Sequence, residues 1–203
     1  VNLYYMKYKD QLVPTGMVND DSNALNTNVP DSYRRGVELS ASWRATGWFT
    51  VGANATFSQN RIENYVDALK DSPTYGKELG DMTIAYSPVA NAFLNFHHRG
   101  FEAVFHTQHV GKQYFTNNEN DALSLDAYCV TNLNLAYTFR TRTARSVRLG
   151  LLINNLFNAE YESNGYGYSY MDTWSGPAPV RIDEAYYFPQ APLNVLANVT
   201  VKF

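Results

Sequence analysis

The chain has 203 residues and a formal net charge of -3; 17% of its residues are charged and 15% are aromatic. So much apolar and aromatic material excludes a disordered chain, and the negative charge argues against a nucleic-acid binder. No stretch approaches the roughly 20 apolar residues of a membrane-spanning helix, which excludes a helical membrane protein. Composition alone does not separate a soluble β protein from a membrane β-barrel.

Apolar and polar side chains alternate with a period of two along much of the chain, which is typical of β-strands. In residues 33–45 the odd positions are mostly apolar and the even positions are polar or small. Clear or weaker forms of this pattern predict eight strands, at about residues 1–11, 33–45, 48–60, 84–98, 101–115, 127–139, 146–157 and 193–203. In the strand 84–98, Ile84, Tyr86 and Ala90 share the apolar face. A disturbed period near His109, Val110 and Gly111 predicts a β-bulge.

The predicted strands and their connections indicate a membrane protein. Each strand has about 11 to 15 residues, which is more than the roughly 5–6 of soluble strands and enough for the roughly 9–11 that cross a bilayer at a tilt. The connections alternate between long and short, in the order 12–32, 46–47, 61–83, 99–100, 116–126, 140–145 and 158–192. Outer-membrane barrels have short periplasmic turns and longer extracellular loops. The sequence therefore predicts an all-β, antiparallel up-and-down transmembrane β-barrel whose C-terminus is periplasmic.

Charged and aromatic residues are distributed as this arrangement of strands and loops predicts. The four long loops hold 16 of the 19 acidic residues. We interpret these acids as a source of solubility and of divalent-ion contacts with the outer-leaflet surface. Capture of a cationic or metal-bearing ligand is the alternative. No loop has the spacing of a metal site, and Asp20-Asp21 and residues 117–121 come closest. Aromatic residues lie near the strand ends, as in the girdles of membrane barrels, although packing inside a soluble core would also explain them.

Five motifs in the second half of the chain resemble segments of TonB-dependent outer-membrane receptors. They are HVGKQY at 109–114, LDAYCVTNL at 125–133, NNLFNAEYE at 154–162, YFPQAPLN at 187–194 and the terminal VTVKF at 199–203. Each motif is weak alone, but their order and spacing over residues 86–203 match the family. Leu193 is a departure, because arginine is commoner there.

The resemblance implies that residues 1–203 are the C-terminal segment of a receptor barrel, the last eight of 22 strands around a plugged lumen. It implies active uptake of a scarce ligand, such as a ferric siderophore, haem, cobalamin or a glycan. Energy would come through the TonB complex, acting on an N-terminal plug region that is absent here. The resemblance also implies a location in the bacterial outer membrane, in contact with its lipid. The barrel-assembly machinery would read the last strand through Val199, Val201 and Phe203.

The final long loop is the candidate contact for a small-molecule ligand. It carries five aromatic candidates, Tyr161, Tyr166, Tyr168, Tyr170 and Trp174, followed by Tyr186-Tyr187, with Gly165, Gly167 and Gly176 between them. Tyrosine and tryptophan offer rigid contact surfaces with a polar group, and glycine lets the backbone adapt. The alternative is that these aromatic side chains pack the loop onto its neighbours or mark the outer interface.

No enzyme, metal site or cofactor is predicted. The nucleophile-elbow, P-loop and zinc-protease motifs do not occur, and Cys129 is a lone cysteine. His97 and His98 are neighbours, so a regular strand points them to opposite faces, and His106 and His109 differ in the same way.

Two other classes of protein share some of these features with a receptor. The main alternative function is a self-contained eight-stranded barrel with a structural or adhesion role. A soluble ligand-binding β protein fits poorly, because its strands would be shorter and its long loops would not all lie at one end. The pattern further predicts a polar lumen face with Glu38, Asn54, Asn132, Asn134, Asn154 and Asn198, and a lipid face with Leu39, Leu133 and Val199.

Overall fold

The computed structural model describes residues 1–18, 23–85 and 88–203. Tyr86, expected on a strand, and the Asp20-Asp21 pair therefore lie outside the described residues. The fold is all-β, with one short 3-10 turn, η1 (Asp121–Leu123). Within the described residues, no helix has the length and apolar character to cross a membrane.

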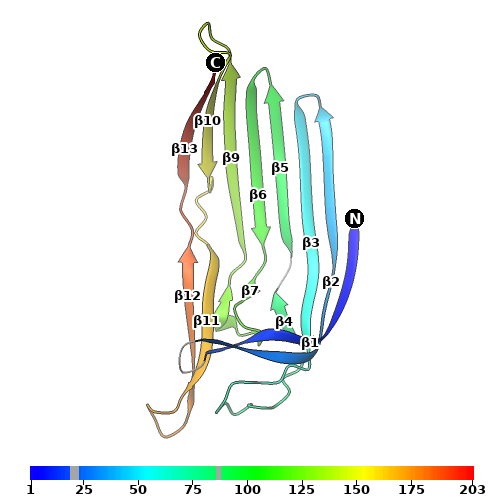
Figure 1. The fold of residues 1–203 in the computed structure, drawn as a ribbon, viewed down its shortest axis with the longest axis vertical. Coiled ribbons are helices and arrows are strands. Elements are labelled where there is room, and N and C mark those ends of the chain that lie inside the picture. The colour runs from blue at the N-terminus through cyan, green and yellow to red at the C-terminus, as the bar shows by residue number, and fades with distance from the viewer. Residues whose placement is uncertain (19–22, 86–87) are drawn as a thin grey trace.

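Within the described residues, eight long strands form the wall of an 11-stranded main sheet (Figure 1). They are β1 (Asn2–Val18), β2 (Ala24–Thr46), β3 (Phe49–Glu63), β5 (Val89–His98), β6 (Phe101–Val110), β9 (Tyr128–Phe139), β10 (Ser146–Asn154) and β13 (Asn194–Lys202). Each pairs antiparallel with the next in this order. The eight predicted strands and their up-and-down order are thus confirmed. β1 and β13 are at opposite edges and do not pair within the described residues, so the sheet is an open wall.

The strand register separates two faces of this wall. One row of apolar side chains crosses seven strands through directly opposed residues: Trp43, Val51, Leu94, Phe105, Leu133, Ile153 and Val195. The opposite face carries polar pairs such as Ser40 with Asn54 and Asn154 with Asn194. The six residues expected in the lumen all share this second face, because opposed residues on antiparallel strands point the same way.

The register also separates the histidines as expected. His97 lies opposite Glu102 and His106 opposite Asn132, which places both on the polar face. His109 lies opposite Cys129 on the apolar face.

The prediction of a long loop at residues 12–32 is wrong for most of this segment. β1 continues to Val18 and β2 begins at Ala24, so the segment is the outer half of a long hairpin. Figure 1 shows this half lying across the other strands toward β11. Its apolar side chains explain the fold-over: Val13 and Val29 form a buried cluster with Ile62 and Tyr65.

A close contact secures the far end of this hairpin. The side-chain amide of Asn117 donates a 2.7 Å hydrogen bond to the carbonyl oxygen of Pro14. Gly16 has φ of 75° and lies against Thr116, where a Cβ atom would come within 2.3 Å of the Thr116 methyl group. Only glycine meets both the backbone angle and the close approach.

The predicted bulge near His109 is also wrong. The register between β5 and β6 is continuous to Val110, where β6 ends. The chain resumes as β7 (Gln113–Tyr114), which pairs with β4 (Met82–Ala85) and β8 (Ser124–Leu125) instead of with β5 and β9. The disturbed period therefore marks a change of strand partners.

Candidate functional site

The final long connection, expected to be a loop, contains a two-stranded hairpin. β11 (Glu162–Asp172) pairs antiparallel with β12 (Val180–Pro189) as a separate sheet beyond the wall (Figure 1). Tyr166 lies opposite Tyr186, and Tyr168 lies opposite Glu184. Alternate residues of each strand therefore share one face. We call the face with Tyr166, Tyr168 and Tyr170 the tyrosine face, and the face with Gly165 and Gly167 the glycine face.

The glycine face packs onto the segment between β7 and β8. A Cβ atom on Gly165 would lie 2.6 Å from the Phe115 ring, and one on Gly167 would lie 2.8 Å from a Leu123 methyl group. Leu123 is fully buried, and the Phe115 ring lies 5.8 Å from that of Tyr187. The two glycines are needed because any larger side chain would separate the hairpin from the segment beneath it.

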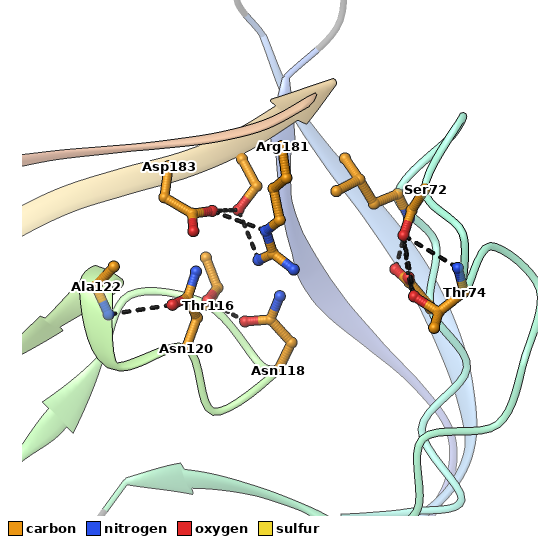
Figure 2. A network of polar contacts seen from close by, with 11 residues as sticks. Ser72, Thr74, Thr116, Asn118, Asn120, Ala122, Arg181 and Asp183 are labelled. Carbon is orange, nitrogen blue, oxygen red and sulfur yellow. Dashed lines mark hydrogen bonds and ion pairs between the residues drawn. The ribbon is translucent and has the colours of Figure 1, made fainter. Parts of the chain in front are cut away.

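Polar contacts continue this packing at the outer end of the hairpin (Figure 2). The hydroxyl of Ser169 donates to a carboxylate oxygen of Asp183 at 2.6 Å, and Arg181 reaches the same oxygen at 2.9 Å. Arg181 also donates to the Ser169 hydroxyl at 3.1 Å. Figure 2 shows Arg181 and Asp183 facing the loop that carries Asn118 and Asn120. Close packing and these polar contacts thus hold the glycine face in place on the segment beneath it.

The tyrosine face is open to solvent and carries a stack of aromatic rings. The rings of Tyr166 and Tyr186 lie 4.9 Å apart at 15°, and Phe188 lies 6.1 Å from Tyr166. Tyr166 is 50% exposed, Tyr186 is 45% and Phe188 is 49%. An exposed stack of this kind offers a rigid surface to a planar or apolar ligand group.

A carboxylate lies beside the stack. Glu184 accepts hydrogen bonds from the phenols of Tyr168 at 2.7 Å, Tyr186 at 2.9 Å and Tyr170 at 3.0 Å. These hydrogen bonds, that of Tyr168 foremost, hold the pKa of Glu184 below its usual range. The carboxylate in turn raises the pKa of the Tyr168 phenol. The face therefore presents neutral phenols around one fixed negative charge.

Three of the five candidate ligand contacts meet on this face: Tyr166, Tyr168 and Tyr170. Tyr161 does not, because its ring stacks on Tyr128 at 4.6 Å, at the base of the hairpin. Trp174 is 86% exposed beyond the end of β11. Glu184 was not among the predicted contacts, although the alternation of Gly and Tyr at 165–168 was a signal for a strand.

The acidic segment at 117–121 is occupied by structural contacts. A carboxylate oxygen of Glu119 accepts from the backbone N–H of Thr83, and Asp121 pairs with Lys112 and accepts from the Tyr114 phenol at 3.1 Å. Across the three described ranges, no group of three or more His, Cys, Asp and Glu side chains is arranged to hold a metal ion. In the last strand, Val199 and Val201 are opposite Leu149 and Val147, and Phe203 is 93% exposed.

Comparisons with known proteins agree with this architecture. The sequence model described as "TonB dependent receptor-like, beta-barrel" matches residues 1–156. The ferric yersiniabactin uptake receptor FyuA of Yersinia pestis has a similar structure, with a TM-score of 0.64 and 18% identity over 99% of this chain. The ferric-catecholate import receptor Fiu of E. coli K12 gives a TM-score of 0.60 and 16% identity over 97%.

The chain spans about a quarter of the length of these two receptors, 27% and 24% respectively. A search of curated proteins gave no match. At such low identity the two structures support the fold only, whereas the family model covers most of the sequence. Taken with the antiparallel wall of eight strands, it shows that the chain belongs to the family of TonB-dependent receptor β-barrels, which reside in the outer membrane.

Proposed function

We propose that residues 1–203 form part of the barrel wall and outer loops of a receptor that takes up a scarce ligand such as a ferric siderophore. TonB would energise this uptake through an N-terminal plug region outside residues 1–203. Membership of the receptor family supports the proposal, and both similar structures are receptors for ferric complexes. The short turns would face the periplasm, together with the end of β13, and the β11–β12 hairpin would face outward.

The tyrosine face of the hairpin is the observation that carries the proposal. Its exposed ring stack can cover an aromatic or apolar part of a ligand, while the phenols of Tyr168 and Tyr170 stay ordered on Glu184. The packed glycine face fixes the hairpin, so that ligand binding loses little conformational entropy. Tyr161 is proposed to support the base of the hairpin, and Trp174 to reach ligand from its tip.

The open edges at β1 and β13 favour a segment of a larger barrel over the self-contained alternative. A closed eight-stranded barrel would pair its first and last strands and fill its lumen with side chains. In this chain the two strands are far apart in the sheet order.

Binding and uptake assays on the membrane-embedded receptor test the proposal. The probes are iron-labelled ferric yersiniabactin and a ferric catecholate. The double variant Tyr166→Ala/Tyr186→Ala should weaken binding about tenfold or more, since an aromatic contact surface is lost. Tyr75→Ala is the matched control, because Tyr75 is 58% exposed in a different loop.

Uptake of a bound ferric complex should also stop when a protonophore collapses the proton-motive force. If the double variant binds the ferric complexes as well as the native receptor does, the hairpin is not part of the binding site. Uptake that persists with the protonophore would exclude energisation by TonB.

A further inference from the structure

The outer half of the β1–β2 hairpin bends away from the wall at a defined point. The register between β1 and β2 skips Asp10 and Pro30. Asp10 has φ of 51°, a left-handed conformation that is uncommon outside glycine, and Pro30 has no N–H to donate. Immediately before this point, Lys7 forms ion pairs with Asp31 at 3.2 Å and Glu63 at 3.5 Å. Asp10 and Pro30 are therefore the hinge of the segment beyond them, residues 11–18 and 24–29, which we call the strap.

The strap lies on the polar face of the wall. Ile62 and Asn54 are an even number of residues apart on the regular strand β3, so both belong to this face. Ile62 is fully buried there by a cluster that includes Val13 and Val29 of the strap. The polar face is the one expected in the lumen. The strap therefore covers the lumen side of the wall at the end opposite the short turns (Figure 1).

The far end of the strap reaches the β11–β12 hairpin. Phe115 packs under the glycine face of that hairpin. The next two residues, Thr116 and Asn117, contact Gly16 and Pro14 of the strap. β1 also contacts β11 directly. The strap thus extends from its hinge across the outer end of the wall to the hairpin that is proposed to bind ligand.

A small set of contacts holds the strap down. The buried apolar cluster has four members, and Asn117 supplies one hydrogen bond to the strap. At the hinge, the Ser32 hydroxyl donates to the side-chain oxygen of Gln11 at 2.5 Å. Other apolar side chains of the strap stay in solvent, since Leu12 is 63% exposed and Leu25 is 39%. Segments with few buried contacts are the ones that open locally while the rest of a protein stays folded.

We propose that the strap is a lid over the outer mouth of the lumen, and that it swings about Asp10 and Pro30 to let bound ligand pass. The inference rests on the proposed function, which places the ligand outside and the lumen beneath the strap. With the strap seated on Ile62, the passage along the polar face is covered, and lifting the strap opens it. The alternative is a fixed brace that stays on Ile62 throughout uptake.

Reversible crosslinking of the full-length receptor in cells separates a lid from a brace. In a Cys129→Ala background, the pair Pro14→Cys/Asn117→Cys joins the strap to the wall, because the backbone oxygen of Pro14 lies 2.7 Å from the amide nitrogen of Asn117. The crosslinker is a short bis-methanethiosulfonate, which a reductant removes. The matched control is Leu12→Cys/Asn28→Cys, two opposed residues that tie the strands of the strap to each other and leave the hinge free.

The receptor with the strap joined to the wall should bind iron-labelled ferric yersiniabactin or a ferric catecholate as before. Its uptake should fall at least tenfold, in proportion to the crosslinked fraction measured by mass spectrometry, and reduction should restore it. The joined control should take up the same complex normally. Undiminished uptake by the joined receptor, an equal loss in the control, or a loss of binding would each overturn the proposal.

A second measurement does not depend on the ligand. The thiol of Ile62→Cys, in the Cys129→Ala background, should react with a maleimide only when the strap lifts. Adding Val13→Ala/Val29→Ala should raise the reaction rate at least tenfold, because both side chains belong to the buried cluster. Adding Leu12→Ala/Leu25→Ala should not change it, because both side chains are exposed.

The outcome is separable from that of the proposed function. If the native receptor takes up neither ferric complex but the maleimide rates differ as expected, the proposed function fails and the lid stands. If uptake is normal and the two double variants react at equal rates, the proposed function stands and the lid is overturned.

Discussion

The phenol of Tyr168 donates a 2.7 Å hydrogen bond to the carboxylate of Glu184, directly opposite it on the neighbouring strand of the hairpin. Tyr186 and Tyr170 donate to the same carboxylate, so a single acidic group orders three rings on the exposed face. The order of the proposed ligand surface thus depends on the ionised form of one side chain.

Lowering the pH should loosen the tyrosine face. The hydrogen bonds lower the pKa of Glu184 below the ordinary 4.5, so their stabilisation is complete above that value. It is lost as the pH falls through the folded-state pKa, because the protonated carboxyl is a weaker acceptor. Hydrogen–deuterium exchange of residues 162–172, corrected for intrinsic rates, should show increased opening below about pH 4.5.

Glu184→Gln should show this loosening at neutral pH and lose the acid dependence. Glu160→Gln is the control, since Glu160 is an exposed acid at the base of the same segment. An acid dependence that survives in Glu184→Gln would mean that another group titrates.

Gly167→Val should detach the hairpin from the segment beneath it. The added side chain meets a Leu123 methyl group at 2.8 Å and the backbone oxygen of Glu184 at 2.9 Å. Overpacking of this kind costs roughly 1–3 kcal/mol. Limited proteolysis should then cut residues 162–189 faster. At Gly176 the nearest atom to an added Cβ is 3.9 Å away, so Gly176→Val should leave the cleavage rate unchanged.

The two faces of the wall should differ in access to water. In a Cys129→Ala background, cysteines at Asn54 and Asn132 should react with a water-soluble maleimide, because the register puts both on the polar face. Cysteines at Leu39 and Leu133 should be protected by lipid. The reverse pattern would invert the assignment of lumen and lipid sides.

Ile62→Ala should release the folded-over half of the β1–β2 hairpin. Ile62 is fully buried against Val13, Val29 and Tyr65, and truncation of such a side chain costs about 2–5 kcal/mol. Urea unfolding of the receptor in lipid vesicles should show this loss. Val66→Ala should change stability by less than about 0.5 kcal/mol, since Val66 is 47% exposed.

The wall was predictable because each of its strands has one face in lipid, which leaves a period of two in the sequence. Leu39, Leu133 and Val199 were assigned to one face from that pattern, and the register agrees. The fold-over of the β1–β2 hairpin was not predictable, because it depends on contacts such as Asn117 with Pro14 that join distant parts of the chain.

The hairpin β11–β12 escaped prediction for a different reason. Its alternation sets Tyr against Gly, and glycine is usually read as a sign of a loop. Here Gly165 and Gly167 mark a strand that packs closely on Phe115 and Leu123. Composition alone places Tyr161 with the other tyrosines of this segment, whereas its ring stacks on Tyr128.

The proposed ligand surface and the anchored face of the hairpin use alternate residues of β11. Tyr166, Tyr168 and Tyr170 face outward, while Gly165, Gly167 and Ser169 face the anchor. If the proposed site is right, substitutions at the even positions change what the surface binds without moving the hairpin, whereas Gly165 and Gly167 leave no room for a larger side chain. A receptor built in this way can acquire a new ligand by single substitutions while its scaffold stays constant.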